Sequence, residues 1–300
     1  MPGVRDDAAV TRLGVVFLPQ FAPERLRDVA QAADAAGLEE LWLWEDCFRE
    51  SGIAAGAAVL AWTRRLQVGI GLLPAPLRNV ALTAMEVATL DRLFPGRLRL
   101  GVGHGVQEWM GQVGARVASP MTLLREYLAA LRVLLAGERV STEGRYVRLS
   151  DVALDWPPPA PPSLLVGAVG PRTVRLSGEL ADGTILTAGT TPAAVRQACE
   201  HIADGRRVAG RTDPHRVTVY LLAATGPGAA DRVRAECRGW ERGDAAEAAV
   251  AGDAEEIAGA VARWAAAGAD TVVLQPTGDE PDPEGFVRFV ASGVGPLLPA

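Results

Sequence analysis

The chain of 300 residues is 49% hydrophobic, 22% charged and 5% aromatic, a composition that excludes a disordered chain and a coiled coil. No apolar run approaches the ~20 residues of a membrane-spanning helix, so we expect no membrane association. The net charge of −6, without a basic stripe, argues against a nucleic-acid partner.

Short apolar runs alternate with segments of helical periodicity along the whole chain. Such runs are typical of buried parallel strands, and apolar residues at helical spacing between Pro and Gly indicate helices. The expected strands are 13–19, 41–45, 66–73, 98–103, 164–169, 183–187, 217–223 and 271–275. The expected helices are 23–37, 53–62, 80–94, 124–134, 172–180, 192–209, 229–240, 253–267 and 283–294.

The alternation breaks between residues 137 and 162. The segment 143–149 has the pattern of an exposed strand, and 156–162 is a proline-rich connector. Eight strand–helix units predict an α/β fold, the (β/α)8 TIM barrel, with a rim insertion between strands four and five. We expect a mobile loop over 241–252 after strand seven, a flexible terminus over 1–12, and a single domain over 13–300.

Several chemistries are excluded by the residues that are rare or missing. The sequence has no lysine, which excludes a Schiff-base lysine and a Walker A loop. Cys47, Cys199 and Cys237 form no CxxC pair, and only three histidines are present. We therefore expect no disulfide framework, no metal site and a cytoplasmic location.

Glu45 and Asp46 directly follow the second strand, where a barrel places its reactive side chains. Two adjacent carboxylates repel, which raises the pKa of one and suits it to acid–base work. Strand alternation groups Glu45 with Leu43, so if Glu45 faces the cavity, Trp42 and Trp44 pack under the helices. The alternative is structural: Asp46 caps the next helix, and Glu45 pairs with Arg49 or Arg78.

Glycines are concentrated in strands three and four. Gly69 and Gly71 lie in one, and Gly101 and Gly103 in the other. Glycine weakens a strand unless a bulge or a close approach requires it. We expect these glycines to leave a slot for a flat ring; the alternative is close packing between the two strands.

A phosphate-binding segment is indicated where the fifth strand leads into a helix. Gly167, Ala168, Val169 and Gly170 would present free backbone N–H groups at the helix start, and Arg172 adds positive charge. Asp182 and Thr187 on the neighbouring strand are expected to support this segment.

Other side chains are weaker candidates. His104 follows the fourth strand at the barrel mouth, although alternation groups it with residues that could face the helices. Glu108 and Trp109 lie on the following loop, Cys47 is expected to be an inert thiol, and His201 and His215 are expected at the surface.

Four segments together resemble the luciferase-like superfamily of flavin- and deazaflavin-dependent oxidoreductases. They are LWLWEDCF (41–48), VGIGLLPAPLRN with AMEVATLDRLFPGRLRLGVGHG (68–105), LREYLAALRVLLAGERVSTEGRYVRL (124–149) and LLVGAVGPRTVRLSGELADGTILTAG (164–189). The resemblance covers roughly residues 13–225 and is strongest to the branch that uses coenzyme F420, which includes methylenetetrahydromethanopterin reductases.

The resemblance implies an F420 ring in the barrel mouth against a bulged third strand, with a non-prolyl cis peptide at Gly71–Leu72. It places the acid of strand two on Glu45. Asp46 stands where relatives carry His or Asp, and Cys47 stands where many relatives carry Tyr. It also implies a homodimer formed through the helix layer. The residues expected to contact the cofactor are Gly71, Leu72, Arg78, Gly103, His104, Gly167, Ala168, Val169, Gly170 and Arg172.

Two positions depart from the family pattern. Val16 stands where some F420 reductases carry a carboxylate, and Val106 where some dehydrogenases carry Glu. Both departures leave proton transfer to Glu45 and Asp46.

The leading hypothesis is hydride transfer between F420 and a small organic substrate, with Glu45 or Asp46 handling the proton. The polyglutamate tail of F420 would require a groove containing Arg49, Arg78, Arg172 or Arg175. One alternative is an FMN-dependent monooxygenase, closed by the loops 104–120 and 241–252. Another is a barrel that binds a ligand without catalysis.

Overall fold

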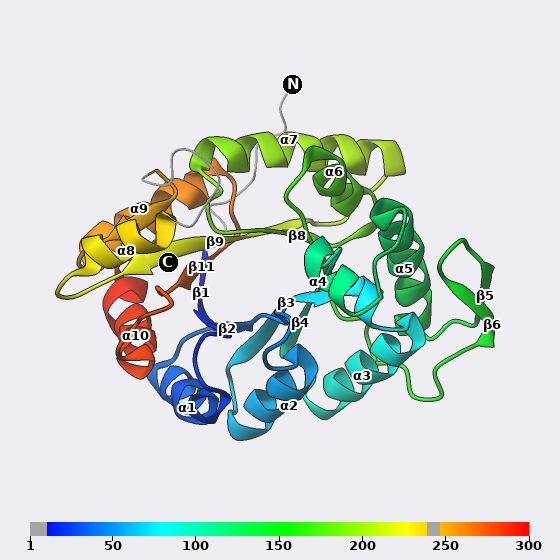
Figure 1. The fold of residues 1–300 in the computed structure, drawn as a ribbon, viewed down its shortest axis with the longest axis horizontal. Coiled ribbons are helices and arrows are strands. Elements are labelled where there is room, and N and C mark those ends of the chain that lie inside the picture. Colours follow the sequence, from blue (N-terminus) through cyan, green and yellow to red (C-terminus); the bar gives the residue numbers. More distant parts are fainter. Residues whose placement is uncertain (1–10, 239–246, 300) are drawn as a thin grey trace.

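A closed ring of eight parallel strands forms the centre of the protein in the computed structural model, which describes residues 11–238 and 247–299 (Figure 1). The strands pair in the order β1-β2-β3-β4-β7-β8-β9-β11, and β11 pairs with β1 to close the ring. Their bounds are β1 Arg12–Phe17, β2 Glu40–Leu43, β3 Gln67–Pro74, β4 Leu98–Gly103, β7 Leu164–Gly167, β8 Gly183–Leu186, β9 Arg216–Ala224 and β11 Thr271–Gln275. The expected (β/α)8 barrel is confirmed.

The strands are buried almost throughout because helices cover them on the outside, as the apolar runs in the sequence predict. Figure 1 shows the helices arranged around the strands. The helices of this outer layer are α1 Leu26–Ala36, α2 Gly52–Trp62, α3 Val80–Leu93, α5 Pro120–Leu135, α6 Pro171–Leu180, α7 Pro192–Ala209, α8 Ala229–Cys237, α9 Ala254–Ala267 and α10 Pro283–Phe289.

Local signals set the helix ends. Ser51, Asn79 and Thr191 each accept a hydrogen bond from a backbone N–H in the first turn of the helix that follows. Asp253 forms a full capping box with Glu256 at the start of α9. These side chains satisfy donors that a helix start otherwise leaves unpaired.

The rim insertion between β4 and β7 differs in detail from the expectation. The segment 143–149 is not one strand: it spans the turn of an antiparallel hairpin made of β5 (Val140–Glu143) and β6 (Arg148–Val152). The Glu126 carboxylate of α5 accepts hydrogen bonds from the backbone of residues 145–147 and holds this turn. The hairpin therefore lies on the outer side of α5, outside the helix layer (Figure 1).

Four further elements differ from the sequence prediction. The loop after β4 contains a short helix, α4 (Gln107–Gln112). In the expected loop 241–252, β10 (Ala249–Ala251) pairs with β9, whereas 241–246 lie outside the described residues. Helix α8 ends at Cys237, and the last helix continues beyond Phe289 as a π-helical turn, Val290–Val294. The expected flexible terminus falls almost entirely on residues 1–10, outside the described residues, and the single domain over 13–300 stays a prediction.

Candidate functional site

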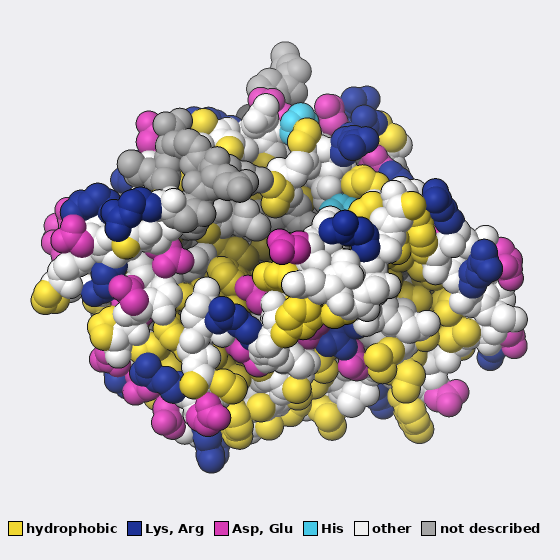
Figure 2. Space-filling view, in the orientation of Figure 1, with side chains coloured by type: hydrophobic (Ala, Val, Ile, Leu, Met, Phe, Trp, Pro, Cys, Tyr) yellow, Lys and Arg dark blue, Asp and Glu magenta, His cyan; other side chains and the backbone are white. Residues whose placement is uncertain are grey.

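The carboxyl ends of the barrel strands surround a cavity of about 730 Å³. This size is within the usual range of small-molecule sites. Figure 2 shows a hollow near the middle of the molecular face, with hydrophobic atoms at its floor. Because every strand of the barrel or the loop after it contributes to the wall, the cavity is the candidate functional site.

Most of the residues expected at the site line this cavity. Those that do are Glu45, Asp46, Gly71, Leu72, His104, Gly167, Ala168, Val169 and Gly170. Three expected cofactor residues do not: Arg78 lines a separate groove, Arg172 is exposed on α6, and Gly103 lies beneath Leu72.

The glycines of strands three and four allow side chains to pack closely inside the barrel. The expectation that they leave a slot for a flat ring is therefore wrong. A Cβ at Gly69 would lie 2.2 Å from the Trp42 ring. One at Gly103 would lie 2.5 Å from Leu72, and one at Gly101 2.6 Å from Ile185. Protein side chains therefore fill the space beside these glycines, and the open cavity lies above them.

The third strand has the expected local form. Its register against β4 shifts between Ile70 and Leu73, which is a bulge, and the Gly71–Leu72 peptide is cis, as the family resemblance implies. The Cys47–Phe48 peptide is also cis, which the sequence did not indicate. The bulge brings Gly71 and Leu72 into the cavity wall.

Trp42 and Trp44 point into the barrel. The alternation argument placed them under the helices only for a Glu45 that faces the cavity. Both rings contact Tyr220 of β9, on the far side of the barrel, with centroids 6.0 and 5.3 Å away. Trp42 fits inside because its partner in the neighbouring strand, at the same level, is Gly69. The alternation then directs Glu45 toward the helix layer.

Glu45 is held in an ion-pair network. Its carboxylate accepts hydrogen bonds from Arg78 at 2.6 and 3.2 Å and from the backbone N–H of Gly52 at 2.9 Å. Arg78 also pairs with Glu86 at 3.0 Å. This is the structural alternative considered for Glu45: the carboxylate links the end of β2 to the start of α2 and to the segment before α3.

Asp46 is the acid with an uncommitted carboxylate. Within residues 11–238 and 247–299 its side chain makes no hydrogen bond or ion pair, and Ser51 rather than Asp46 caps α2. Burial raises the pKa of Asp46, and nearby Arg49 partly opposes this. A carboxyl of raised pKa that lines a cavity is suited to accept or donate a proton.

The start of α6 presents backbone donors to the cavity. Ala168 N–H bonds to Ile185, but Val169 and Gly170 N–H groups have no acceptor among the described residues. No side chain caps this helix. The expected anion-binding segment therefore has two open donors at the positive end of a helix.

His104 and Thr173 form the wall next to this segment. His104 lines the cavity, and its Nε2 lies 3.1 Å from Oγ1 of Thr173 in the first turn of α6. Burial lowers the pKa of His104, which favours the neutral ring near neutral pH. The wall beside the open amides is thus polar and uncharged.

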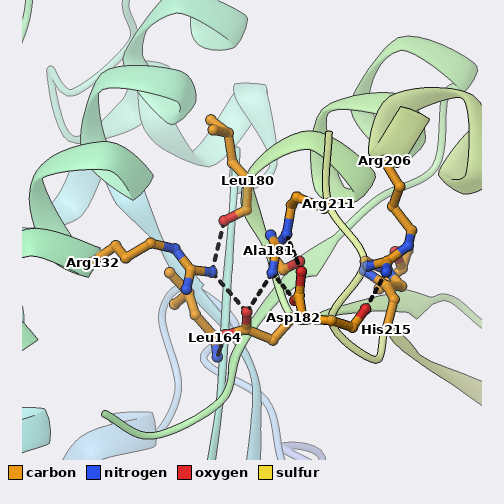
Figure 3. A network of polar contacts seen from close by, with 10 residues as sticks. Arg132, Leu164, Leu180, Ala181, Asp182, Arg206, Arg211 and His215 are labelled. Atoms are coloured by element: carbon orange, nitrogen blue, oxygen red, sulfur yellow. Dashed lines mark hydrogen bonds and ion pairs between the residues drawn. The ribbon is translucent and has the colours of Figure 1, made fainter. Parts of the chain in front are cut away.

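Asp182 does not support the anion-binding segment, because it lies at the opposite end of β8. Its carboxylate accepts hydrogen bonds from Arg132 and Arg211, both at 2.8 Å, and from the backbone N–H of Leu164 at 2.9 Å (Figure 3). This network joins α5, β7 and the end of α7 at the amino end of the barrel. Thr187, by contrast, lines the cavity as expected.

The expected arginine groove is not formed. Arg49 donates to the carbonyl of Pro19, Arg78 is paired with two glutamates, and Arg175 pairs with Glu179. Arg172 is exposed in the first turn of α6. These four arginines do not meet at one surface.

Sequence reasoning missed the cavity floor and one side of its wall. Tyr220 is 3% exposed and donates a hydrogen bond to the Gly71 carbonyl at 3.1 Å, which fixes the bulge from across the barrel. Burial raises the pKa of Tyr220, so its hydroxyl stays protonated. Gln275, at the end of β11, and Glu236 of α8 form the side wall. The sequence does carry a signal for Gln275, because a polar residue at the carboxyl end of an apolar barrel strand is expected to line the site.

A family model of luciferase-like monooxygenases matches residues 7–271. The chain belongs to the luciferase-like monooxygenase family. This confirms the resemblance drawn from the sequence.

The chain is also similar to curated proteins. The chain is 30% identical over 211 residues to 5,10-methylenetetrahydromethanopterin reductase of Methanolobus tindarius, which covers 70% of this chain and 64% of that protein. It is 37% identical to F420-dependent glucose-6-phosphate dehydrogenase of Kineococcus radiotolerans, over 57% of this chain and 54% of that protein. The matches thus span roughly half to two thirds of these relatives.

The similarity of fold covers more of the chain than the similarity of sequence does. The structure of the coenzyme F420-dependent tetrahydromethanopterin reductase from Methanopyrus kandleri superposes with a TM-score of 0.82 at 21% identity, covering 97% of this chain and all of that one. In the described part of this luciferase-like protein, no cluster of His, Cys, Asp and Glu could hold a metal ion, and no helix is long and apolar enough to cross a bilayer.

Proposed function

We propose that the protein is an F420-dependent oxidoreductase that transfers a hydride between the deazaflavin and a small organic substrate. The observation that carries the proposal is that a single cavity combines the open amides before α6 with the uncommitted carboxyl of Asp46. Relatives named as F420-dependent reductases and dehydrogenases support the choice of cofactor.

The residues present fit a deazaflavin with a phosphate-bearing side chain. The N–H groups of Val169 and Gly170 would hold the phosphate, because they are unpaired at a helix start. The apolar wall at Leu72 and the β3 bulge would hold the ring. When bound, the deazaflavin supplies the carbon that gives or takes the hydride, and the protein supplies position and charge control.

Asp46 is the proposed proton-handling residue, in place of the pair Glu45 and Asp46 expected from the sequence. Glu45 already accepts three hydrogen bonds within 3.2 Å, so we assign it the role of holding the β2 end in place. Asp46 would accept a proton from the substrate when the substrate is oxidised, and return it when the reaction runs in reverse.

Cofactor titrations test the proposal. Purified protein is titrated with F420 and with FMN, and binding is followed calorimetrically. We expect F420 to bind at least tenfold more tightly than FMN and to be reduced or oxidised by substrate without oxygen uptake. Tighter FMN binding with oxygen uptake would support a luciferase-like monooxygenase instead, and binding of neither would support a non-catalytic barrel.

We also propose that the protein is a homodimer that pairs through α2 and α3. Helix α2 is apolar on its outer side as well as its inner side, which is unusual for a surface helix. Trp62 at its end is 37% exposed, and Leu82 and Met85 of α3 are 45% and 58% exposed. An apolar surface of this kind indicates a protein–protein contact.

The oligomeric state can be measured by light scattering after size-exclusion chromatography. We expect a dimer for the unchanged protein and a monomer for Met85→Glu, because a charge would be buried in the interface. Val208→Glu is the matched control, since Val208 is 56% exposed on α7. A monomeric unchanged protein would contradict the proposal.

A further inference from the structure

The wall of the cavity is divided into two chemically different halves. One half follows β4, β7 and β8 and contains His104, Thr173 and the open amides before α6. The other half follows β9, β11, β1 and β2 and contains Glu236, Gln275, Gln20 and Asp46. These halves face each other because the strand order places β9, β11, β1 and β2 together on one arc of the barrel.

The second half, which we call the acidic half, has carboxylates and no cation among its described lining residues. Two arginines of the neighbouring segments are engaged elsewhere. Arg49 donates to the Pro19 carbonyl at 2.8 Å, and Arg232 donates to Glu280 at 3.1 Å and to the Thr225 carbonyl at 3.0 Å. No described side chain in this half could therefore neutralise an anionic group.

Gln275 gives a second, independent indication of a ligand at the same place. Its side chain lines the cavity, the residue is only 5% exposed, and its Oε1 has no hydrogen-bond partner among the described residues. An unpaired buried amide oxygen costs free energy unless a donor reaches it. The acidic half thus presents acceptors: the amide oxygen of Gln275, the carboxylate of Asp46, and the carboxylate of Glu236, whose Oε2 also accepts a hydrogen bond from the Gly278 N–H at 3.2 Å.

We infer that the acidic half is the substrate subsite and that it takes a neutral or cationic molecule whose hydroxyl or amino group donates hydrogen bonds, and rejects phosphorylated or carboxylated substrates. That the bound molecule is a substrate rests on the proposed function. The selectivity for its charge is argued from the described cavity wall alone. It separates this chain from the relatives named glucose-6-phosphate dehydrogenases, whose named substrate carries a phosphate.

Matched six-membered-ring probes test the selectivity. The full-length protein is titrated calorimetrically at pH 7.5 with cyclohexanol, cyclohexylamine and cyclohexanecarboxylate, in the absence and in the presence of saturating F420. We expect the carboxylate to bind at least tenfold more weakly than the alcohol and the amine. We expect Gln275→Leu to weaken the alcohol and the amine about tenfold, because both lose an acceptor.

Charge-neutralising variants identify the origin of the selectivity. Glu236→Gln and Asp46→Asn should each reduce the difference in affinity between the alcohol and the carboxylate to about threefold or less. Glu138→Gln, an exposed residue after α5, makes the same charge change away from the mouth and should leave this difference unchanged.

The inference would be overturned if the carboxylate bound as tightly as the alcohol or more tightly, or if none of the three probes bound. It would also be overturned if neither Glu236→Gln nor Asp46→Asn changed the ratio of the carboxylate and alcohol affinities. A protein that fails to bind F420 but keeps the selectivity would overturn the proposed function and leave this inference standing. The two failures are therefore distinguishable.

Discussion

Asp46 and Glu45 are adjacent in sequence, but their surroundings give them different chemistry. Glu45, although it lines the cavity, is neutralised by Arg78, which is itself shared with Glu86. Asp46 lines the cavity without a partner in the described chain, and burial raises its pKa. The neighbour that is free of structural bonds is the one available for proton transfer.

The pH dependence of turnover distinguishes the two acids. If Asp46 accepts the proton during substrate oxidation, it must be ionised, so kcat/KM falls as pH decreases through its raised pKa. Asp46→Asn should remove this acidic limb and reduce kcat by about 10²–10⁴. Steady-state rates measured between pH 4.5 and 8 report both effects.

Glu45→Gln is the matched control. It should leave the acidic limb in place and lower the free energy of unfolding by about 1–3 kcal/mol, because Arg78 loses a charged acceptor. An acidic limb that disappears in Glu45→Gln and persists in Asp46→Asn would reverse the assignment.

At the scale of elements, periodicity was sufficient to predict the barrel and insufficient to predict which strand face points inward. Strands β4 and β11 and helix α7 have the predicted bounds, because buried strands and capped helices carry local signals. In strands buried on both faces the alternation does not distinguish inside from outside. The alternation alone therefore leaves two orientations open for Trp42, and the structure shows that it packs inside the barrel against Gly69.

The same limit applies to the site. Several residues that the sequence predicts as cofactor contacts line the cavity, including Gly71 and Leu72 of β3 and the segment 167–170. The cofactor contact itself stays a prediction. Residues that contribute from the far side of the barrel, such as Tyr220 and Glu236, were missed because their role depends on the closed strand order. The hairpin β5–β6 was missed because its two strands are short and meet only through tertiary pairing.

Substitution of Gly69 tests the packing explanation. In Gly69→Ala the added Cβ would lie 2.2 Å from the Trp42 ring, so we expect unfolding free energy to fall by about 1–3 kcal/mol. Gly259→Ala on α9 meets nothing within 4 Å and should raise stability by about 0.5–1 kcal/mol through helix propensity. Urea unfolding measures both; a neutral Gly69→Ala would contradict the assigned packing.

At the scale of the whole molecule, the two ends of the barrel have different roles. The carboxyl end carries the cavity, and the amino end is joined by polar networks such as that of Asp182 with Arg132 and Arg211 (Figure 3). His215, expected at the surface, is partly buried beside this network, with Nε2 2.8 Å from Thr184 Oγ1. Burial, aided by Arg206, lowers the pKa of His215 to about 4.

Stability should depend on pH through His215. Its pKa is lower in the folded protein than the unfolded value of about 6.5, so the unfolded chain binds a proton that the folded chain does not. Its contribution is fully present above the unfolded pKa and is lost as pH falls from about 6.5 toward 4. Between pH 7.5 and 5 the unfolding free energy should drop by roughly 2 kcal/mol on this account.

Urea unfolding of the unchanged protein and of His215→Gln at both pH values isolates this contribution. The difference in unfolding free energy between the two proteins should be smaller at pH 5 than at pH 7.5, because only the unchanged protein loses the contribution of His215. Asp182, whose pKa is lowered mainly by its hydrogen bonds against the opposing effect of burial, stays ionised in both conditions. A difference that is constant with pH would show that His215 does not titrate as described.

We propose that one cavity holds the phosphate of the deazaflavin on the amides before α6 and its ring beside Asp46. A crystal structure of the protein with bound F420 tests this arrangement. We expect the phosphate within hydrogen-bond distance of the N–H groups of Val169 and Gly170, and the ring between Leu72 and the Asp46 side of the cavity. A phosphate bound elsewhere, or a ring outside the cavity, would contradict it.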